Sequence, residues 1–158
     1  MTTTERTVTH STFTIERHYP AQLERVFAAF ADPAKKRRWF AEGEGRILED
    51  FEMDFRVGGT ERLVYRFQEG SPFPGALLIN RTTYHDIVPG RRVVFAYTMT
   101  LNDRCFSASL VTVEFMPSDN GTELTFTDQG AYFEGADGAA MRQQGWTKIL
   151  EDLAQRLA

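Results

Sequence analysis

The sequence predicts an α+β protein in which six or seven antiparallel strands form one sheet that a long C-terminal helix covers. Three observations support this fold class. Residues 137–158 contain apolar side chains at helical spacing and no proline. Residues 46–127 instead alternate apolar and polar side chains, which is typical of strands with one buried face. Short turn signals separate these strands, and strands joined by tight turns pair antiparallel.

The chain is expected to begin with a flexible polar segment, residues 1–10, followed by a single domain over residues 11–158. The first element of the domain is a strand over 11–18, in which Phe13 and Ile15 alternate with polar neighbours. The length suffices for one domain with a core, and neither a repeat nor a linker indicates a second domain.

Two short helices are predicted after this strand. Pro20 suits the first position of the first helix, whose apolar residues recur at helical spacing as far as Phe30. Asp32 can cap the second helix, which is expected to run to about Phe40. The basic residues 35–38 are expected on the outer side of this second helix.

Six further strands are predicted over 46–127, where the apolar period changes to two. Gly58–Gly59 and Asn120–Gly121 mark two of the turns between them. The strand that begins near Ala76 has no clean alternation, so either of its faces could be the buried one. Residues 128–135 are expected to lead out of the last strand into the final helix.

The C-terminal helix is the only element large enough to cover the sheet, and Asp137 is its expected N-cap. Its apolar face is expected to contain Met141, Gly145, Ile149, Leu153 and Leu157, widened by Trp146, Leu150 and Ala154. Gly145 costs about 1 kcal/mol relative to alanine, which close approach of another backbone would offset. Arg142, Lys148 and Asp152 are expected on the other faces of the helix.

Composition excludes several classes of function. The net charge of −4 argues against a nucleic-acid surface, which would need a basic face. No stretch is long and apolar enough for a membrane span. The single cysteine, Cys105, cannot form an intrachain disulfide, so a reducing compartment and a cytoplasmic location are expected. The three histidines lack metal-ligand spacing, so neither a metal nor another cofactor is expected.

Six motifs occur in an order that closely resembles the activator of heat-shock-protein-90 ATPase homologue-like family. They are D-P-x-x-x-x-x-W at 32–39, D-F-R-V-G-G at 54–59, D-I-V-P-G-R-R-V-V-F at 86–95, T-V-E-F at 112–115, G-T-E-L-T-F-T at 121–127 and G-W-T-K-I-L-E-D-L at 145–153. That family belongs to the START/SRPBCC superfamily, and the resemblance covers about residues 11–158. It implies the helix-grip fold, a curved sheet of about seven strands around the C-terminal helix, with an apolar cavity that opens near the short helices.

Aromatic side chains are the main clue to a function, because they make up 13% of the chain. Such rings either fill a core or line an apolar cavity. The candidate residues of a cavity between sheet and helix are Trp39, Phe40, Phe55, Tyr65, Phe67, Arg81, His85, Tyr97, Met99, Phe126, Met141 and Trp146. Tyr65 and Tyr97 are of interest because a buried phenol needs a hydrogen-bond partner, which a ligand could supply. Arg81 and His85 either point inward and orient a ligand or face solvent.

Three functions are compatible with these observations. The first is the binding of a small apolar or aromatic ligand in the cavity. The second is a co-chaperone-like interaction module that stimulates the heat-shock-protein-90 ATPase, although the resemblance concerns the fold and the sequence family and does not bring co-chaperone activity with it. The third is a polyketide cyclase or aromatase-type enzyme, although no catalytic motif is visible. The enzyme would require inward polar groups, such as Arg81, His85, Tyr97 or Asp128, to converge in one pocket. A homodimer formed through edge strands of the sheet is a further option.

Overall fold

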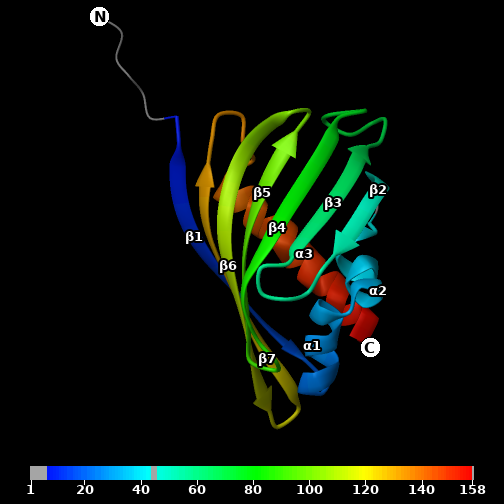
Figure 1. Cartoon of the computed structure of the whole chain (residues 1–158), viewed down its shortest axis with the longest axis vertical. Helices are drawn as coiled ribbons and strands as arrows, with labels where there is room; N and C mark the ends of the chain where they lie inside the picture. The colour runs from blue at the N-terminus through cyan, green and yellow to red at the C-terminus, as the bar shows by residue number, and fades with distance from the viewer. Residues whose placement is uncertain (1–6, 44–45, 158) are drawn as a thin grey trace, which may run out of the picture.

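The computed structural model describes residues 7–43 and 46–157 and confirms the expected fold class, a seven-stranded antiparallel sheet with a long C-terminal helix on one face (Figure 1). The elements are β1 (Thr9–Tyr19), α1 (Leu23–Ala31), α2 (Pro33–Lys36), the π-helical turn η1 (Arg37–Ala41), β2 (Arg46–Met53), β3 (Thr60–Phe67), β4 (Leu77–Val88), β5 (Arg92–Leu101), β6 (Arg104–Ser118), β7 (Gly121–Tyr132) and α3 (Ala139–Leu157). The strand order is β1-β7-β6-β5-β4-β3-β2.

The sheet is curved, and α3 crosses its concave face from the β1 side toward the short helices (Figure 1). The antiparallel pairing is interrupted by register shifts at Leu48/Asp50, Tyr84/Asp86 and Met99/Thr100. Such bulges bend a strand and increase its local twist. Two of them lie within the β2–β5 half of the sheet and the third lies between β5 and β6, so together they help this part of the sheet to curve around the helix. No described helix has the length and apolar character that a membrane crossing requires.

The buried face of α3 differs from the expected one. It contains Arg142, Trp146, Leu150, Leu153 and Leu157, whereas Met141 is 64% exposed. In the N-terminal half of α3 the buried positions are therefore Arg142 and Trp146 in place of Met141 and Gly145, a shift of one residue or about 100° around the helix axis. The helical pattern placed Arg142 on the solvent side because arginine is charged. In the structure the Asp137 carboxylate neutralises this charge, so the side chain can be buried. The helix also begins at Ala139, so Asp137 lies before its first turn and is not its N-cap.

Strand β7 runs to Tyr132, five residues beyond the expected end at Thr127. Asp128 pairs with Phe13 of β1 and with Val111 of β6, so this segment lies inside the sheet. The prediction that residues 128–135 leave the sheet was wrong for the first five of them. The inward-facing positions of this segment are occupied by Asp128 and Gly130. Because neither residue is apolar, the alternating pattern of a strand could not be recognised in the sequence.

The short helices follow the sequence prediction with two exceptions. Helix α1 begins at Leu23 with Gln22 at its N-cap, so the prediction that Pro20 occupies its first position was wrong. The Asp32 carboxylate accepts hydrogen bonds from the backbone N–H groups of Ala34 and Lys35, which confirms the expected cap. Lys36, however, is 4% exposed, although the basic run was expected on the outer side. Its ammonium donates to Glu61 at 2.6 Å and to the Tyr84 hydroxyl at 3.3 Å. This buried ion pair attaches α2 to the sheet.

Candidate ligand-binding site

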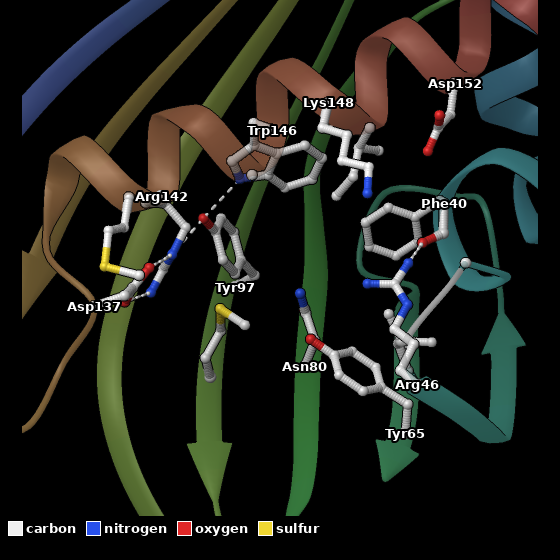
Figure 2. A pocket seen from close by; sticks show the side chains of 16 residues that line it. Phe40, Arg46, Tyr65, Asn80, Tyr97, Asp137, Arg142, Trp146, Lys148 and Asp152 are labelled. Carbon is white, nitrogen blue, oxygen red and sulfur yellow. Dashed lines mark hydrogen bonds and ion pairs between the residues drawn. The ribbon is translucent and has the colours of Figure 1, made fainter. Parts of the chain in front are cut away.

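A cavity of about 260 Å³ lies between α3, η1 and the inward side of strands β2 to β5 (Figure 2). It is lined by Phe40, Gly43, Arg46, Leu63, Tyr65, Asn80, Tyr97, Met99, Asp137, Met141, Arg142, Gly145, Trp146, Lys148, Ile149 and Asp152. Drug-sized sites begin at about 300 Å³, whereas an apolar cavity of about 150 Å³ suffices for benzene. The cavity is therefore of a size for a ligand of one or two fused rings.

Aromatic rings from the helices form one wall of the cavity. Phe40 of η1 and Trp146 of α3 stack with their ring centroids 5.7 Å apart and their planes 20° apart. Tyr97 of β5 meets Trp146 edge to face at 6.0 Å. The rings thus come from three separate elements and present flat apolar surfaces to the same space.

Gly145 contributes to the cavity by lacking a side chain. A Cβ atom built at this position would meet nothing within 4 Å. The expectation that another backbone approaches Gly145 closely was therefore wrong. Gly145 is exposed and lines the cavity where it meets solvent, and there the helix bears the conformational cost of a glycine and leaves open the space that a larger side chain would occupy.

The Tyr97 hydroxyl is fully used by the protein. It donates to Asp128 Oδ2 at 2.8 Å and accepts from Trp146 Nε1 and Arg142 Nη1, both at 3.0 Å. A phenol has one proton to donate and two lone pairs, so none is left for a ligand. Burial, partly opposed by the nearby Arg142 guanidinium, raises the pKa of Tyr97. The phenol therefore stays protonated, and Tyr97 offers a ligand its ring but not its oxygen.

Arg142 anchors the start of α3 beneath the cavity. Only 5% of the residue is exposed, and its guanidinium donates two hydrogen bonds of 2.8 Å to Asp137 and one of 2.9 Å to Ser107 Oγ. Burial disfavours its charge, but the hydrogen bonds with Asp137 and Tyr97 outweigh this effect and raise the pKa of Arg142. Its charge is thus neutralised inside the protein by the Asp137 carboxylate.

Asp128 lies behind Tyr97 and is fully buried. Its Oδ2 accepts from Tyr97, while its Oδ1 has no partner among the described residues. Burial raises the pKa of this carboxyl, and the hydrogen bond from Tyr97 only partly opposes the shift. Asp128 therefore holds the Tyr97 phenol in place from below and does not itself line the cavity.

Other polar groups that face the cavity are not used in this way. Asn80 is 7% exposed and accepts a hydrogen bond from Thr82 at its Oδ1, while its amide nitrogen points into the cavity (Figure 2). Arg46 donates one hydrogen bond of 3.0 Å to the Phe40 carbonyl, and its Nε is buried without a partner in the described part of the chain. Lys148 of α3 extends toward the same space (Figure 2). Burial also raises the pKa of Tyr65, whose ring lies 4.7 Å from the Arg46 guanidinium.

The structure brings half of the expected cavity residues together. Phe40, Tyr65, Tyr97, Met99, Met141 and Trp146 line the cavity. Met141 borders the cavity but is itself exposed, because the neighbouring Arg142 is the residue of α3 that faces inward at this point.

Arg81 and His85 are exposed, so their prediction as cavity residues was wrong. The register of β4 directs Asn80, Thr82 and Tyr84 inward, and the side chains between them therefore face the other side of the sheet. The four polar groups named for an enzyme of the cyclase type do not converge. Only Tyr97 and Asp128 meet, and no cluster of metal-ligating side chains occurs in the described ranges.

Four further aromatic residues were wrongly expected in the cavity. Trp39 and Phe126 lie in the core behind it, where Phe126 packs against Trp146 at 4.6 Å. Phe55 follows the end of β2 and packs against Tyr84, while Phe67 lies near the far end of β3. Alternation places a ring on the concave face but does not tell how far along the strand the helix leaves open space.

The polar lining was missed by sequence reasoning, which selected rings and two residues of the wrong face of β4. The overlooked residues include Arg46, Asn80, Asp137, Arg142, Gly145 and Lys148. One signal was available for Asn80, since it interrupts the apolar residues at alternate positions of β4. The spacing of apolar residues in the sequence does not indicate that the other overlooked residues would line a cavity.

The chain is similar to several known proteins. A family model described as Activator of Hsp90 ATPase homolog 1-like protein matches residues 20–158. The solved structure of Mll3558 from Rhizobium loti is similar, with 49% identity, a TM-score of 0.84 and coverage of 96% of this chain and 100% of that chain. An uncharacterised protein from Rhizobium leguminosarum is 38% identical, with a TM-score of 0.89 and 98% coverage of both chains.

A more distant similarity extends the same fold. An AHSA1-like protein from Aeromonas hydrophila is 23% identical, with a TM-score of 0.67 over 92% of this chain and 90% of that chain. At that identity the similarity shows the fold alone. No match was found among curated proteins.

Proposed function

The chain belongs to the family of Activator of Hsp90 ATPase homolog 1-like proteins, and we propose that it binds a small aromatic or largely apolar ligand between its sheet and α3. The observation that carries this proposal is the cavity of about 260 Å³ walled by Phe40, Tyr97 and Trp146. The cavity opens to solvent beside Met141 and Lys148, which are exposed, and its inner wall consists of large buried rings. A recess of this form is suited to a small ligand that places its apolar part against the rings.

The lining supports the same ligand class. The stacked Phe40–Trp146 pair offers a flat surface on which a ring can lie. Asn80 and Arg46 supply a few fixed polar groups that would orient the ligand. An apolar pocket with few convergent polar groups is the usual form of a small-molecule site.

Native mass spectrometry of the protein as purified, beside a denatured control, is the first test. A reproducible extra mass that is lost on denaturation would support a resident ligand and begin its identification. Calorimetric titration with indole, 2-methylnaphthalene and 2-naphthoate then tests binding directly. No extra mass together with no binding of any of the three probes would contradict the proposal.

A cavity-filling variant localises the binding. Gly145→Leu places a branched side chain where a Cβ has open space, so probe affinity should fall by roughly tenfold or more. Gln144→Leu is the matched control, because the same side chain enters the same helix at an exposed position outside the cavity. Equal affinities of the two variants would place the binding site elsewhere.

A second candidate function is a co-chaperone-like module that stimulates the ATPase of heat-shock protein 90. The observation that favours it is the family match. An ATPase assay with the chaperone tests it, and absence of stimulation would dismiss it. If stimulation occurs and survives in Gly145→Leu, the activity belongs to the outer surface and is independent of the cavity.

A further inference from the structure

The polar groups that face the cavity are mostly hydrogen-bond donors. Arg142 and Asp137 satisfy each other, and the Tyr97 oxygen is saturated. The Asn80 oxygen is engaged by Thr82, which leaves the amide N–H groups for the cavity. A ligand that fills this space therefore meets donors that need an acceptor.

Arg46 is the strongest of these donors. One of its N–H groups is held by the Phe40 carbonyl, and its guanidinium lies over the Tyr65 ring at 4.7 Å. Its Nε is buried and has no partner within residues 7–43 and 46–157. A buried donor without a partner is rare in folded proteins. The Nε and Nη2 side of the guanidinium lies beside Gly43 and the Phe40 carbonyl. Figure 2 shows the remaining nitrogen pointing across the cavity toward Asn80, so this nitrogen is the donor that a ligand would meet.

The charged side chains of the cavity lining also favour a ligand that accepts hydrogen bonds. Among the described residues, the charged side chains of the lining are Arg46, Arg142, Lys148, Asp137 and Asp152. Once the Arg142–Asp137 pair is set aside, two cations and one carboxylate remain. Figure 2 shows this carboxylate, Asp152, on α3 beyond Lys148, with Phe40 between it and Arg46. Within the described residues, the lining therefore carries one more positive than negative charge. A monoanion would neutralise it.

We infer that the ligand is an aromatic carboxylate, whose ring lies on Phe40 and Trp146 and whose carboxylate accepts from Arg46 and Asn80. This inference rests on the proposed function, because it names the chemistry of the ligand of that same cavity. Guanidinium groups suit a carboxylate because their N–H donors match its two oxygens. Lys148 adds charge from the opposite side, at the mouth.

Paired probes with the same ring test the inference. Calorimetry should show that 2-naphthoate binds the wild-type protein about tenfold or more tightly than 2-methylnaphthalene, as hydrogen bonds to a charged group would require. 2-Naphthamide, a neutral acceptor of nearly the same shape, should bind more weakly than 2-naphthoate. Equal binding of the acid and the hydrocarbon would overturn the inference and leave the proposed function intact. Equal binding of acid and amide would overturn its anionic part.

Variants assign the preference to residues. Asn80→Leu and Arg46→Met should each remove most of the preference for 2-naphthoate, while the affinity for 2-methylnaphthalene stays within about twofold. Lys148→Met should weaken 2-naphthoate a few-fold, and the exposed Lys35→Met, outside the cavity, should not. Because Lys148 is exposed, this pair remains informative if Arg46→Met fails to fold. Persistence of the preference in Asn80→Leu and Lys148→Met would overturn the inference, whereas failure of every probe would instead refute the proposed function.

Discussion

Tyr97 shows how a single hydroxyl can organise one end of the cavity. Its oxygen joins β5 to two residues of α3 and to Asp128 of β7. These bonds hold the Trp146 indole with its ring plane toward the cavity, stacked on Phe40. The shape of the aromatic wall therefore depends on a polar atom that does not itself reach the ligand.

Tyr97→Phe should lower the free energy of unfolding by about 1–3 kcal/mol, because it leaves the Trp146 N–H and the Asp128 carboxylate without their partner. Guanidinium denaturation measures this loss. Tyr132→Phe is the control, since it deletes the same atom from a buried phenol whose oxygen has no hydrogen-bond partner within the described ranges, and it should cost under about 0.5 kcal/mol. Similar losses for both variants would contradict the role given to Tyr97.

Asp128 should make stability depend on pH. Burial raises the pKa of this carboxyl above its ordinary 3.8, so the folded state binds the proton more tightly than the unfolded state. Its contribution to stability is therefore largest at low pH and falls as pH rises from the ordinary pKa through the raised one. Asp128→Asn removes this slope, and its Oδ1 can still accept from Tyr97. Urea denaturation should show the variant gaining on the wild type as pH rises from about 4 toward neutrality. A difference that stays constant with pH would refute this.

At the scale of elements, a buried ion pair holds the short helices on the sheet. Lys36 of α2 contacts Glu61 of β3 and Tyr84 of β4, and its ammonium also lies 4.7 Å from the Phe40 ring. Glu61 in turn accepts from the Tyr84 hydroxyl at 2.5 Å. Since Phe40 forms part of the aromatic wall, this anchor also sets the position of one side of the cavity.

Lys36→Met should destabilise the protein by about 3–5 kcal/mol, because it leaves the Glu61 carboxylate buried and unpaired. Lys36→Met/Glu61→Gln should recover most of this loss, since the neutral amide still accepts from Tyr84 and carries no charge. Thermal and chemical denaturation of the three proteins provide the comparison. If the double variant is no more stable than the single one, the ion pair is not the cause of the loss.

Two glycines should respond oppositely to the same substitution. Gly145→Ala should stabilise by about 0.5–1 kcal/mol, because the added methyl group has open space and alanine favours the helix. In Gly130→Ala the methyl group would approach the buried Tyr132 ring to 2.9 Å, so the strand or the ring must shift, at about 1–3 kcal/mol. Melting temperatures would reveal the contrast. A loss of stability in Gly145→Ala would mean that the space beside it is not open.

At the scale of the whole molecule, the interior has a packed half and an open half. On the β1–β7–β6 side, residues such as Phe126 and Leu150 pack the sheet tightly against α3. On the β2–β5 side the sheet bends through its bulges, and the cavity separates it from the same helix. A ligand in this space would complete the contact between the two layers and so couple binding to folding.

Ligand binding should therefore stabilise the entire fold. A probe at about 100 times its Kd should add about 2.7 kcal/mol to the free energy of unfolding. Differential scanning fluorimetry with 2-naphthoate should show the corresponding rise in Tm for the wild type and for Gln144→Leu. Gly145→Leu should show little rise at the same concentration. A rise of the same size in Gly145→Leu would indicate binding outside the cavity.

Local pattern in the sequence was sufficient for the arrangement of elements. The alternation of strands, the Asp32 cap, the turn glycines and the amphipathic C-terminal helix are properties of neighbouring residues, and the structure confirms them. The order of six motifs was sufficient for the family, which the match over residues 20–158 confirms. Several rings of the cavity followed from the same reasoning, because alternation tells which side chains face the helix.

The tertiary structure alone decided the register of β4 and the burial of charges. Asn80 faces the cavity and Arg81 faces away because pairing with β3 and β5 selects one of two locally equivalent registers. Lys36 and Arg142 were assigned to the surface because burying a charge is costly without a partner. Glu61 of β3 pairs with Lys36, whereas Arg142 relies on Asp137 nearby in the chain and on Tyr97 of β5. Whether a charge can be buried depends on partners that only the folded chain brings together, so periodicity could not show it.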